Sequence, residues 1–343
     1  MMPAGRLQPL RPHVIEAHAP VRVCDNGGWT DTWFGAPGSV FNVAVAPGVF
    51  VTIDTFEAGD GVVLDVADFG ERYAIVPGAP RVPRHPLLEA AVDALPPPPG
   101  LAVEIGVRSA VPSGCGTGTS AAVAVALLAA LGCARGEQRT PLELAHAAHR
   151  LEVDALGEQS GIQDQICAAF GGINYLEIGP YPETTVERLP AWDDLGAGLS
   201  LVFLGRPHDS SALHSQVIEA LSHGTTEILS RLRAAARQAR EAVMRRDLDA
   251  LGRSMVANTE AQRRLHPALV GLDAQRLIDL SRSCGALGWK VNGAGGDGGS
   301  LTVLSATAEQ KMALEAAILE SAPAYRILPV RVSEEGVTVR GAP

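Results

Sequence analysis

The sequence has few lysines, few aromatic residues and a deficit of positive charge. Only Lys290 and Lys311 are lysines among its 28 basic residues, aromatic residues make up 4% of the chain, and the formal net charge is −10 at pH 7. Because nucleic acids and anionic membranes attract basic surfaces, this charge argues against either as a partner. The arginine-rich stretch 223–253 is interleaved with acidic residues and lacks stacking aromatics, so we expect a solvated helix face there.

Paired cysteines and long apolar runs are also missing. The five cysteines contain no Cys-x-x-Cys pair, and their odd number argues against a disulfide framework. No run of about 18 apolar residues, the length of a transmembrane helix, is present, and the first fifteen residues hold no apolar segment of signal-peptide type. These features predict a protein of the reducing cytoplasm. At 343 residues the chain exceeds the usual size of one core, so we expect two domains.

A glycine-punctuated stretch at 112–120 stands between a predicted strand at 101–108 and an alanine-rich helix. Gly114, Gly116 and Gly118 alternate with small residues, which favours positive φ and inward-pointing N–H groups. If Thr119 or Ser120 caps the helix, its positive end faces the same point and completes an anion site. The spacing fits neither Gly-Lys-Ser/Thr nor the dinucleotide fingerprint. A tight strand-to-helix connection without a ligand is the alternative.

Two further segments each contain a candidate acidic residue. Thr140 and Glu143 predict the start of a helix, and Glu152 lies near its end, where an acid is unfavourable for the helix dipole and needs a compensating group. Asp164 follows in the glycine-flanked segment 157–178. A solvated aspartate on a short helix is the alternative for Asp164.

Other stretches predict strands and turns. Residues 38–56 alternate around Pro47 and Gly48, which predicts a hairpin, and residues 62–76 predict another. The turn-rich segment 24–35 follows a β-branched run, and 290–304 is a glycine-rich turn that leads into a strand. The C-terminal residues 325–341 predict two strands that close the second domain.

Four of these segments resemble conserved segments of the GHMP kinases, the family of galactokinase, homoserine kinase, mevalonate kinase and phosphomevalonate kinase. The sequence PSGCGTGTSAA is similar to P-x-x-x-G-L-G-S-S-A-A, with Thr117 in place of the usual Leu and Thr119 in place of the first Ser. The sequence APVRV followed by GGWTD resembles the first signature in the form of the fucokinase and heptose-phosphate kinase branch. The segments GIQDQ and GAGGDGG resemble the remaining family segments.

The resemblance implies an α+β, two-lobed GHMP kinase fold. The N-terminal ATP-binding lobe (1–190) would be ribosomal S5 domain 2-like, and the C-terminal lobe (191–343) ferredoxin-like, with the active site between them. The implied reaction is transfer of the γ-phosphate of ATP, with Mg²⁺, to a hydroxyl of a small-molecule sugar or sugar phosphate. A homodimer is left open.

The resemblance also assigns roles to residues of this sequence. Asp164 would act on the hydroxyl proton, Arg22 would lie near the transferred phosphoryl group, and Ser120 and Glu152 would hold magnesium. The implied nucleotide-binding residues are Pro112, Gly114, Cys115, Gly116, Thr117, Gly118, Thr119, Ser120, Gly293, Gly295 and Gly296. The implied substrate-binding residues are Asp31, Gly28, Trp29, Thr30 and Gln163. Without the resemblance, Asp31 is equally a turn former and Arg22 a surface ion-pair partner.

The acceptor is the least determined part of this hypothesis. The GGWTD form favours the anomeric C1 hydroxyl of a heptose 7-phosphate, but Trp33 and Phe34 replace the Pro-Pro expected in that branch. Arg206 and His208, beside two serines at 210–211, form a basic and hydroxyl cluster suited to an acceptor phosphate. A free-sugar 1-kinase of fucose or galactose type, a non-catalytic sugar sensor and a diphosphate decarboxylase are the alternatives.

Overall fold

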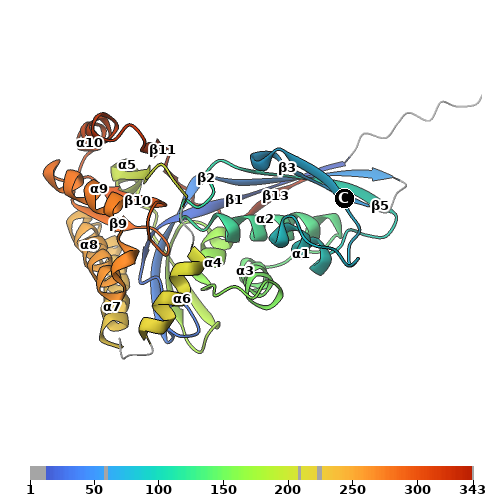
Figure 1. The fold of residues 1–343 in the computed structure, drawn as a ribbon, viewed down its shortest axis with the longest axis horizontal. Coiled ribbons are helices and arrows are strands. Elements are labelled where there is room, and N and C mark those ends of the chain that lie inside the picture. Colours follow the sequence, from blue (N-terminus) through green and yellow to red (C-terminus); the bar gives the residue numbers. More distant parts are fainter. Residues whose placement is uncertain (1–12, 58–60, 208–209, 222–225, 342–343) are drawn as a thin grey trace, which may run out of the picture.

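The computed structural model describes residues 13–57, 61–207, 210–221 and 226–341, which form two β-sheets with helices packed against them. Figure 1 shows a long sheet that extends through one half of the molecule and a smaller helix-rich half beside it. Within the described residues, no helix is both long and apolar enough to cross a bilayer.

Among the described residues the larger sheet has nine strands, with the path β13-β1-β2-β5-β3-β4; β6 and β12 pair with β2, and β7 pairs with β6. All pairings are antiparallel except β3 with β5. The strands are β1 (His13–Asn26), β2 (Gly38–Glu57), β3 (Val62–Val66), β4 (Glu71–Ile75), β5 (Leu101–Ser109), β6 (Ile173–Ile178), β7 (Thr184–Leu189), β12 (Arg331–Val332) and β13 (Thr338–Arg340).

Strand β2 is continuous, so the hairpin expected at 38–56 is wrong. Its first part pairs with β6 and its second part pairs with β5. The pairing of β1 with β2 shifts register between Ala19 and Val21, opposite Pro47 and Gly48. The Pro-Gly pair therefore marks a bulge in one long strand, where irregularity replaces a chain reversal. The hairpin expected at 62–76 is confirmed by β3 and β4.

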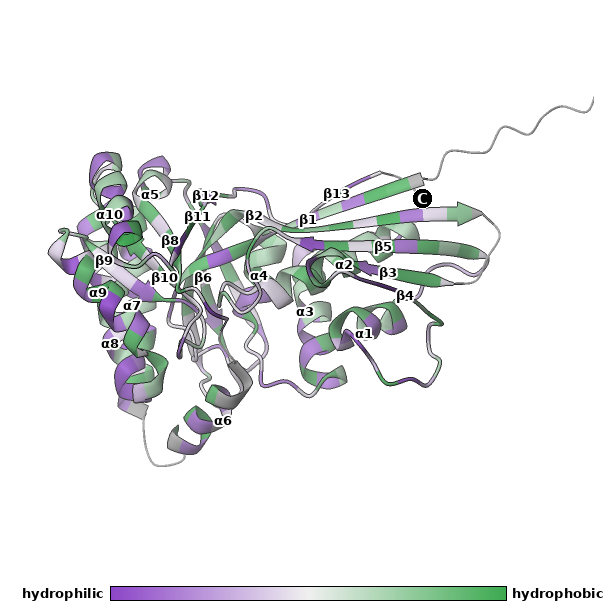
Figure 2. Ribbon diagram, turned by 45° about the horizontal axis from the view of Figure 1, so that its top comes forward, coloured by the Kyte–Doolittle hydropathy of each residue, from purple (hydrophilic) through white to green (hydrophobic). Residues whose placement is uncertain are grey.

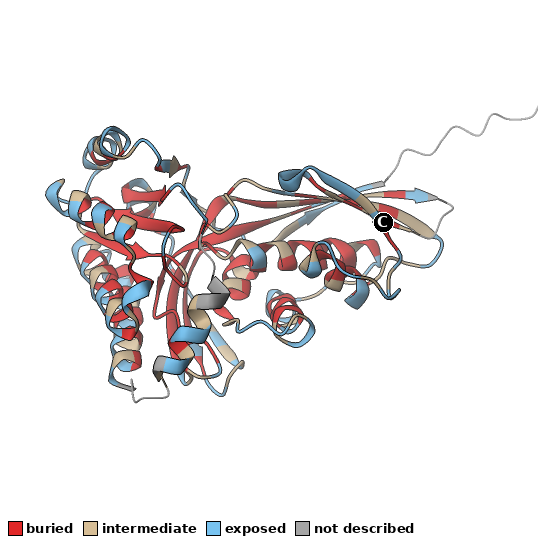
Figure 3. Ribbon diagram, in the orientation of Figure 1, coloured by how far each residue is buried: buried red, intermediate tan, exposed pale blue. Residues whose placement is uncertain are grey.

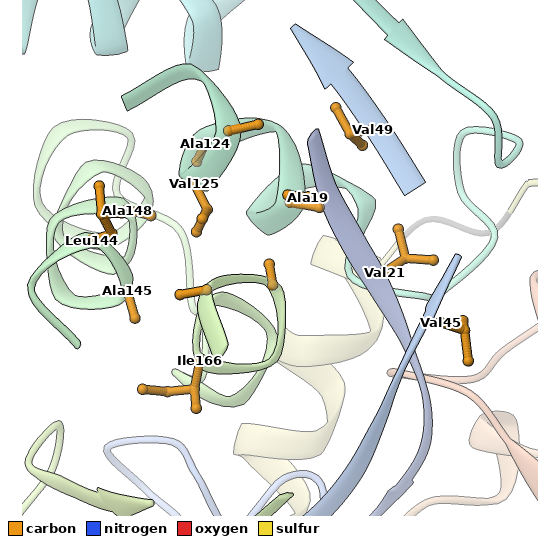
Figure 4. Packing of buried hydrophobic residues seen from close by; sticks show 14 of the residues in the cluster. Ala19, Val21, Val45, Val49, Ala124, Val125, Leu144, Ala145, Ala148 and Ile166 are labelled. Atoms are coloured by element: carbon orange, nitrogen blue, oxygen red, sulfur yellow. The ribbon is translucent and has the colours of Figure 1, made fainter. Parts of the chain in front are cut away.

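Helices cover one face of this sheet around helix α2 (Thr119–Ala134), which is largely buried (Figure 3). The helices beside it are α1 (Pro86–Ala94), α3 (Pro141–Arg150) and α4 (Gln163–Phe170), with the 3₁₀ turn η1 (Ala67–Phe69) and the π-helical turn η2 (Leu151–Ala155). Figure 4 shows Ala124 and Val125 of α2 among small apolar residues of β1 and α3. Small side chains allow the close packing that buries α2 on several sides. The predicted capping box of Thr140 and Glu143 is confirmed at the start of α3.

The smaller sheet has the order β11-β8-β10-β9, entirely antiparallel. Its strands are β8 (Leu199–Phe203), β9 (Gly288–Val291), β10 (Ser300–Leu304) and β11 (Arg326–Leu328). The helices of this half are α5 (Asp193–Gly198), α6 (Ser210–Leu221), α7 (Thr226–Arg245), α8 (Leu248–Leu265), α9 (Leu272–Ser283) and α10 (Ala308–Ser321), with the 3₁₀ turn η3 (Pro267–Leu269). In Figure 2, α7 and α8 alternate between hydrophilic and hydrophobic colours, as amphipathic helices do.

The C-terminal strands do not all stay in the second half, which corrects the expectation for residues 325–341. Strand β11 joins the four-stranded sheet, whereas β12 pairs with β2 and β13 pairs with β1. The end of the chain therefore returns to the first sheet and joins the two halves. The lobe boundary at 190/191 stays a prediction.

Candidate active site

A cavity of about 1230 Å³ brings the four motif segments together. Its walls come from the loop at 112–120, the segment after β1, the segment around η2 and α4, and the turn at Gly293 and Ala294. Pockets for one small ligand are usually about 300–1,000 Å³. The cavity is therefore large enough to hold two substrates side by side.

The glycine-rich loop has the conformation expected from its sequence. Gly114, Gly116 and Gly118 have φ values of +67°, +76° and +70°. Gly118 is the N-cap of α2, so the expectation that Thr119 or Ser120 caps the helix is wrong. Both hydroxyl residues lie in the first helical turn and line the cavity. The free N–H groups at the start of α2 make this end suited to a phosphate.

Three other loop residues differ in position. Pro112 and Cys115 line the cavity, whereas Thr117 is fully buried and is not among the lining residues. The carbonyl oxygen of Thr117 accepts a 2.9 Å hydrogen bond from the backbone N–H of Arg22. Thr117 therefore attaches the loop to β1.

Arg22 and Asp164 form a bidentate ion pair at the centre of the cavity wall. Arg22 Nε donates to Asp164 Oδ1 at 2.8 Å, and Nη2 donates to Oδ2 at 3.1 Å. Arg22 Nη1 also donates to the carbonyl oxygen of Gly116. Although burial alone would lower the pKa of Arg22, the charges of Asp164 and Asp25 raise it above its usual range. A single guanidinium therefore joins the α4 carboxylate to the phosphate loop.

Glu152 lies in the π-helical turn η2, an irregularity that often marks functional sites. Its carboxylate accepts hydrogen bonds from Ser120 Oγ at 2.9 Å, Ser160 Oγ at 2.8 Å and Gln165 Nε2 at 2.6 Å. Burial raises the pKa of Glu152 to about 7, against the opposing effect of its serine donors. These donors supply the compensation expected for an acid at a helix end. The roles of Ser160 and Gln165 were not apparent from the sequence.

The pair of Ser120 and Glu152 fits a magnesium site. Within the described residues, no group of three His, Cys, Asp or Glu residues forms a metal site. Mg²⁺ bound with a nucleotide usually takes one or two protein oxygens and completes its shell with phosphate oxygens and water. A buried carboxylate beside a hydroxyl at the phosphate loop supplies that donor set.

Asp31 faces the cavity from the turn that follows β1. Its Oδ2 accepts the backbone N–H of Gln163 at 3.1 Å. A Cβ atom on Gly161 would lie 2.1 Å from the same oxygen, so only glycine permits this approach. Burial raises the pKa of Asp31 to about 6, and the charge of Asp164 acts in the same direction. Asp31 and Asp164 are therefore two carboxylates of one cavity.

The other predicted substrate residues divide into two groups. Gly28, Trp29 and Gln163 line the cavity, and the buried atoms Trp29 Nε1 and Gln163 Oε1 have no hydrogen-bond partner in the described part of the chain. Thr30 does not line the cavity, because its hydroxyl donates to the carbonyl oxygen of Gly27 and accepts from Ser39 N within the turn. Thr30 therefore shapes the turn that presents Asp31.

Of the three glycines predicted to bind nucleotide in the segment 290–304, one lines the cavity. Gly293 lines it, but Gly295 and Gly296 bond to Asn292 and Leu269 within the second half of the molecule. Gly295 and Gly296 therefore shape the turn and do not face the cavity.

Arg206 lies outside the cavity lining. Its side chain is 54% exposed, donates to Asp273 Oδ2 at 2.7 Å and lies 3.8 Å from Asp297. His208 falls outside the described residues. The basic side chains that do line the described cavity belong to Arg22, His85, His214 and Arg326. His214 of α6 contacts the Trp29 ring at 4.9 Å.

Comparison with known proteins finds one matching domain and several similar kinases. Residues 86–172 match the GHMP kinases N terminal domain. A mevalonate kinase of Thermococcus sibiricus is 29% identical over 244 residues, which cover 69% of each chain. A D-glycero-alpha-D-manno-heptose 7-phosphate kinase of Campylobacter jejuni is 25% identical over 203 residues, 58% of this chain and 60% of that protein.

Solved structures show the same fold. A D-glycero-D-manno-heptose 1-phosphate kinase from Bacteriodes thetaiotaomicron superposes with a TM-score of 0.75 at 19% identity and covers 95% of this chain and 98% of that one. The galactokinase of Lactococcus lactis superposes with a TM-score of 0.72 at 16% identity, covering 95% of each chain. The fold is that of a GHMP kinase, as the sequence resemblance implied. Residues 86–172 are therefore similar to the N-terminal domain of the GHMP kinases, whose members are phosphotransferases acting on sugar or alcohol groups.

Proposed function

We propose that this protein is an ATP-dependent sugar kinase that transfers the γ-phosphate to the anomeric C1 hydroxyl of a heptose 7-phosphate. The observation that carries the proposal is the position of Arg22, which bonds Asp164 on one side and the phosphate loop on the other. A group that removes a hydroxyl proton and a site for the phosphate donor must lie within reach of each other in phosphoryl transfer.

The described residues supply the functions that phosphoryl transfer needs. Asp164 accepts or orients the proton of the attacking hydroxyl. Arg22 and the N–H groups at the start of α2 stabilise the negative charge that develops on the transferred group. Ser120 and Glu152 would hold Mg²⁺, which neutralises charge on the β- and γ-phosphates when bound. An ATP-dependent reaction of this kind agrees with the cytoplasmic location expected from the sequence.

The acceptor side of the cavity suits a polyhydroxylated molecule. Asp31 offers a carboxylate, which accepts strong charge-assisted hydrogen bonds from hydroxyl groups. The unpartnered Trp29 Nε1 and Gln163 Oε1 add one donor and one acceptor in the same wall. Together with the GGWTD form of the turn, these groups support a sugar acceptor.

Arg206 pairs with Asp273 outside the cavity lining, so it does not hold a phosphate of the acceptor. His214 lies beside Trp29 on the acceptor side and is the group that we assign to an acceptor phosphate. The position of Arg206 favours a free-sugar 1-kinase as the second candidate. The identity to the Thermococcus sibiricus protein makes mevalonate a third acceptor to test.

A coupled ADP-release assay across a panel of acceptors tests the proposal. The panel contains heptose 7-phosphate, the free heptose, fucose, galactose and mevalonate, each with ATP and Mg²⁺. The proposal expects the highest kcat/KM with heptose 7-phosphate. Preference for a free sugar would support the second candidate, and turnover of mevalonate alone would refute a sugar kinase.

A further inference from the structure

Lys290 is a fully buried lysine at the junction of the two halves. It lies in β9, has no exposed surface, and donates to Asp25 Oδ1 at 3.1 Å and to the carbonyl oxygen of Val291. Burial lowers the pKa of Lys290, and the carboxylate of Asp25 opposes that change. Buried ion pairs cost desolvation energy and are often no more stabilising than apolar residues. A contribution to stability therefore does not by itself explain the pair of Lys290 and Asp25.

Asp25 connects Lys290 to the candidate catalytic pair. Its Oδ2 accepts the backbone N–H of Gly293 at 3.0 Å and lies 3.9 Å from Arg22 Nη2. Arg22 in turn forms the bidentate pair with Asp164. The charges therefore alternate along a line of four side chains, from Lys290 through Asp25 and Arg22 to Asp164, and sum to zero.

The same contacts fix the third glycine-rich turn against the phosphate loop. Gly293 has a φ of +61°, and a Cβ atom there would lie 2.9 Å from the carbonyl oxygen of Gly116 and 3.3 Å from Arg22 Nη2. Ser300 Oγ also donates to the carbonyl oxygen of Cys115 at 2.6 Å. Asp25 thus holds the turn at the place where it touches both Arg22 and the loop.

Arg22 has two carboxylates within reach, and the charge of Lys290 bears on which one it pairs with. The charge of Lys290 already compensates the charge of Asp25, so Arg22 pairs with Asp164. If the lysine charge were removed, Asp25 would be a buried carboxylate with Arg22 as its nearby cation in the described structure. An uncompensated buried charge is strongly unfavourable, so Arg22 would be drawn toward Asp25.

We propose that Lys290 and Asp25 are positioning residues, whose ion pair keeps the guanidinium of Arg22 on Asp164 and aligned with the phosphate loop. This role rests on the proposed function, because it assumes that Arg22 and Asp164 serve phosphoryl transfer. Neither Lys290 nor Asp25 needs to touch a reacting atom to act in this way.

Substitution of the two residues separately and together tests the role kinetically. Lys290→Met lowers kcat at least about tenfold, because small displacements of reacting groups are costly, and changes KM for ATP less than about threefold. The double variant Lys290→Met/Asp25→Asn removes both charges and keeps an acceptor oxygen for Gly293 N–H. Its kcat exceeds that of Lys290→Met at least about threefold, since the two residues are coupled.

Lys311→Met is the matched control, because Lys311 is the other lysine of the chain, lies on α10 and does not line the cavity. Its kcat is that of the wild type. Thermal unfolding of every variant reports the folded fraction, so that kcat is expressed per folded molecule. Equal kcat for the wild type and Lys290→Met, or a double variant slower than Lys290→Met, would overturn the proposal.

A crystal structure of Lys290→Met tests the geometry without any acceptor. The proposal expects Arg22 at hydrogen-bond distance from Asp25, with the bidentate contact to Asp164 lost. An Arg22 side chain that remains on Asp164 contradicts the proposal. If Lys290→Met cannot be crystallised, the structure of the double variant Lys290→Met/Asp25→Asn is determined instead. The proposal expects the bidentate contact between Arg22 and Asp164 to be present there. An inactive wild type with the displaced Arg22 in Lys290→Met would instead reject the proposed function alone.

Discussion

Arg22 Nε and Asp164 Oδ1 lie 2.8 Å apart, although the two residues are 142 positions apart in the chain. The contact joins the first strand of the large sheet to the first turn of α4. Arg22 also reaches the carbonyl oxygen of Gly116, so the pair lies directly beside the phosphate loop. Arg22 therefore lies between a carboxylate and an anion site.

Replacement of the Asp164 carboxylate by an amide tests its role in proton transfer. Asp164→Asn lowers kcat at least about a hundredfold, the usual scale for loss of a general base, and leaves the affinity for ATP nearly unchanged. Steady-state kinetics and calorimetric titration with ATP measure the two quantities. Full activity in the amide variant would refute the assignment of Asp164.

The buried carboxylate of Glu152 and the hydroxyl of Ser120 are expected to set the magnesium requirement. Glu152→Gln or Ser120→Ala raises the Mg²⁺ concentration needed for half-maximal activity, because each substitution removes an oxygen ligand from a hard cation. Asp154→Asn is the control, since Asp154 is an exposed carboxylate in the same π-helical turn. Identical magnesium titrations for all three variants and the wild type would rule out this site.

The raised pKa of Asp31, about 6, predicts pH-dependent acceptor binding. Below pH 6 the carboxylate is protonated in the free enzyme and becomes a weaker acceptor for sugar hydroxyls. KM for the acceptor therefore rises as the pH falls through 6, whereas KM for ATP changes less. Asp31→Asn removes this pH dependence. A KM for the acceptor that is constant from pH 8 to pH 5 would contradict the prediction.

The same shift predicts a change in stability with the opposite sign from that of an aspartate whose pKa is lowered on folding. The pKa of Asp31 rises from 3.8 to about 6 on folding, so the folded state holds the proton more tightly. The free energy of unfolding therefore falls as the pH rises through this interval. Asp31→Asn raises the stability above pH 6, and the difference disappears below pH 4. Denaturant unfolding at several pH values measures the effect, and equal stability at pH 8 would count against it.

His214 and Arg206 offer a direct test of how the acceptor is held. His214→Ala raises KM for heptose 7-phosphate about tenfold or more, since hydrogen bonds to charged groups contribute about 1.5–3 kcal/mol. Arg206→Ala, expected from the sequence to have this effect, leaves KM within about twofold, because an exposed arginine paired with Asp273 contributes little. A KM that rises about tenfold in Arg206→Ala but stays within about twofold in His214→Ala would instead assign the acceptor phosphate to Arg206.

Short motifs made the phosphate loop predictable from the sequence. The alternation of Gly114, Gly116 and Gly118 determines local backbone geometry, and their positive φ values follow from the absence of a side chain. The capping box of Thr140 is likewise local. By contrast, Pro47 and Gly48 look like a turn, but pairing with two neighbouring strands keeps β2 extended. Tertiary pairing overrode the local signal there.

Contacts between distant segments explain what the sequence did not reveal. Lys290 and Asp25 are 265 positions apart, and no spacing rule links them. Ser160 and Gln165 act on Glu152 only because the π-helical turn places its carboxylate between them. Arg206 stands near hydroxyl residues in the sequence, yet a salt bridge to Asp273 holds it outside the cavity lining.

The central claim is that this cavity phosphorylates the anomeric hydroxyl of a heptose 7-phosphate. Phosphorus NMR of a reaction with ATP, Mg²⁺ and heptose 7-phosphate tests the claim by identifying the product, and Asp164→Asn serves as the control enzyme. The account predicts ADP together with a new phosphate resonance coupled to the anomeric proton, formed by the wild type and far more slowly by the control. ADP with free inorganic phosphate, a phosphate on another hydroxyl, or equal rates for the two enzymes would contradict it.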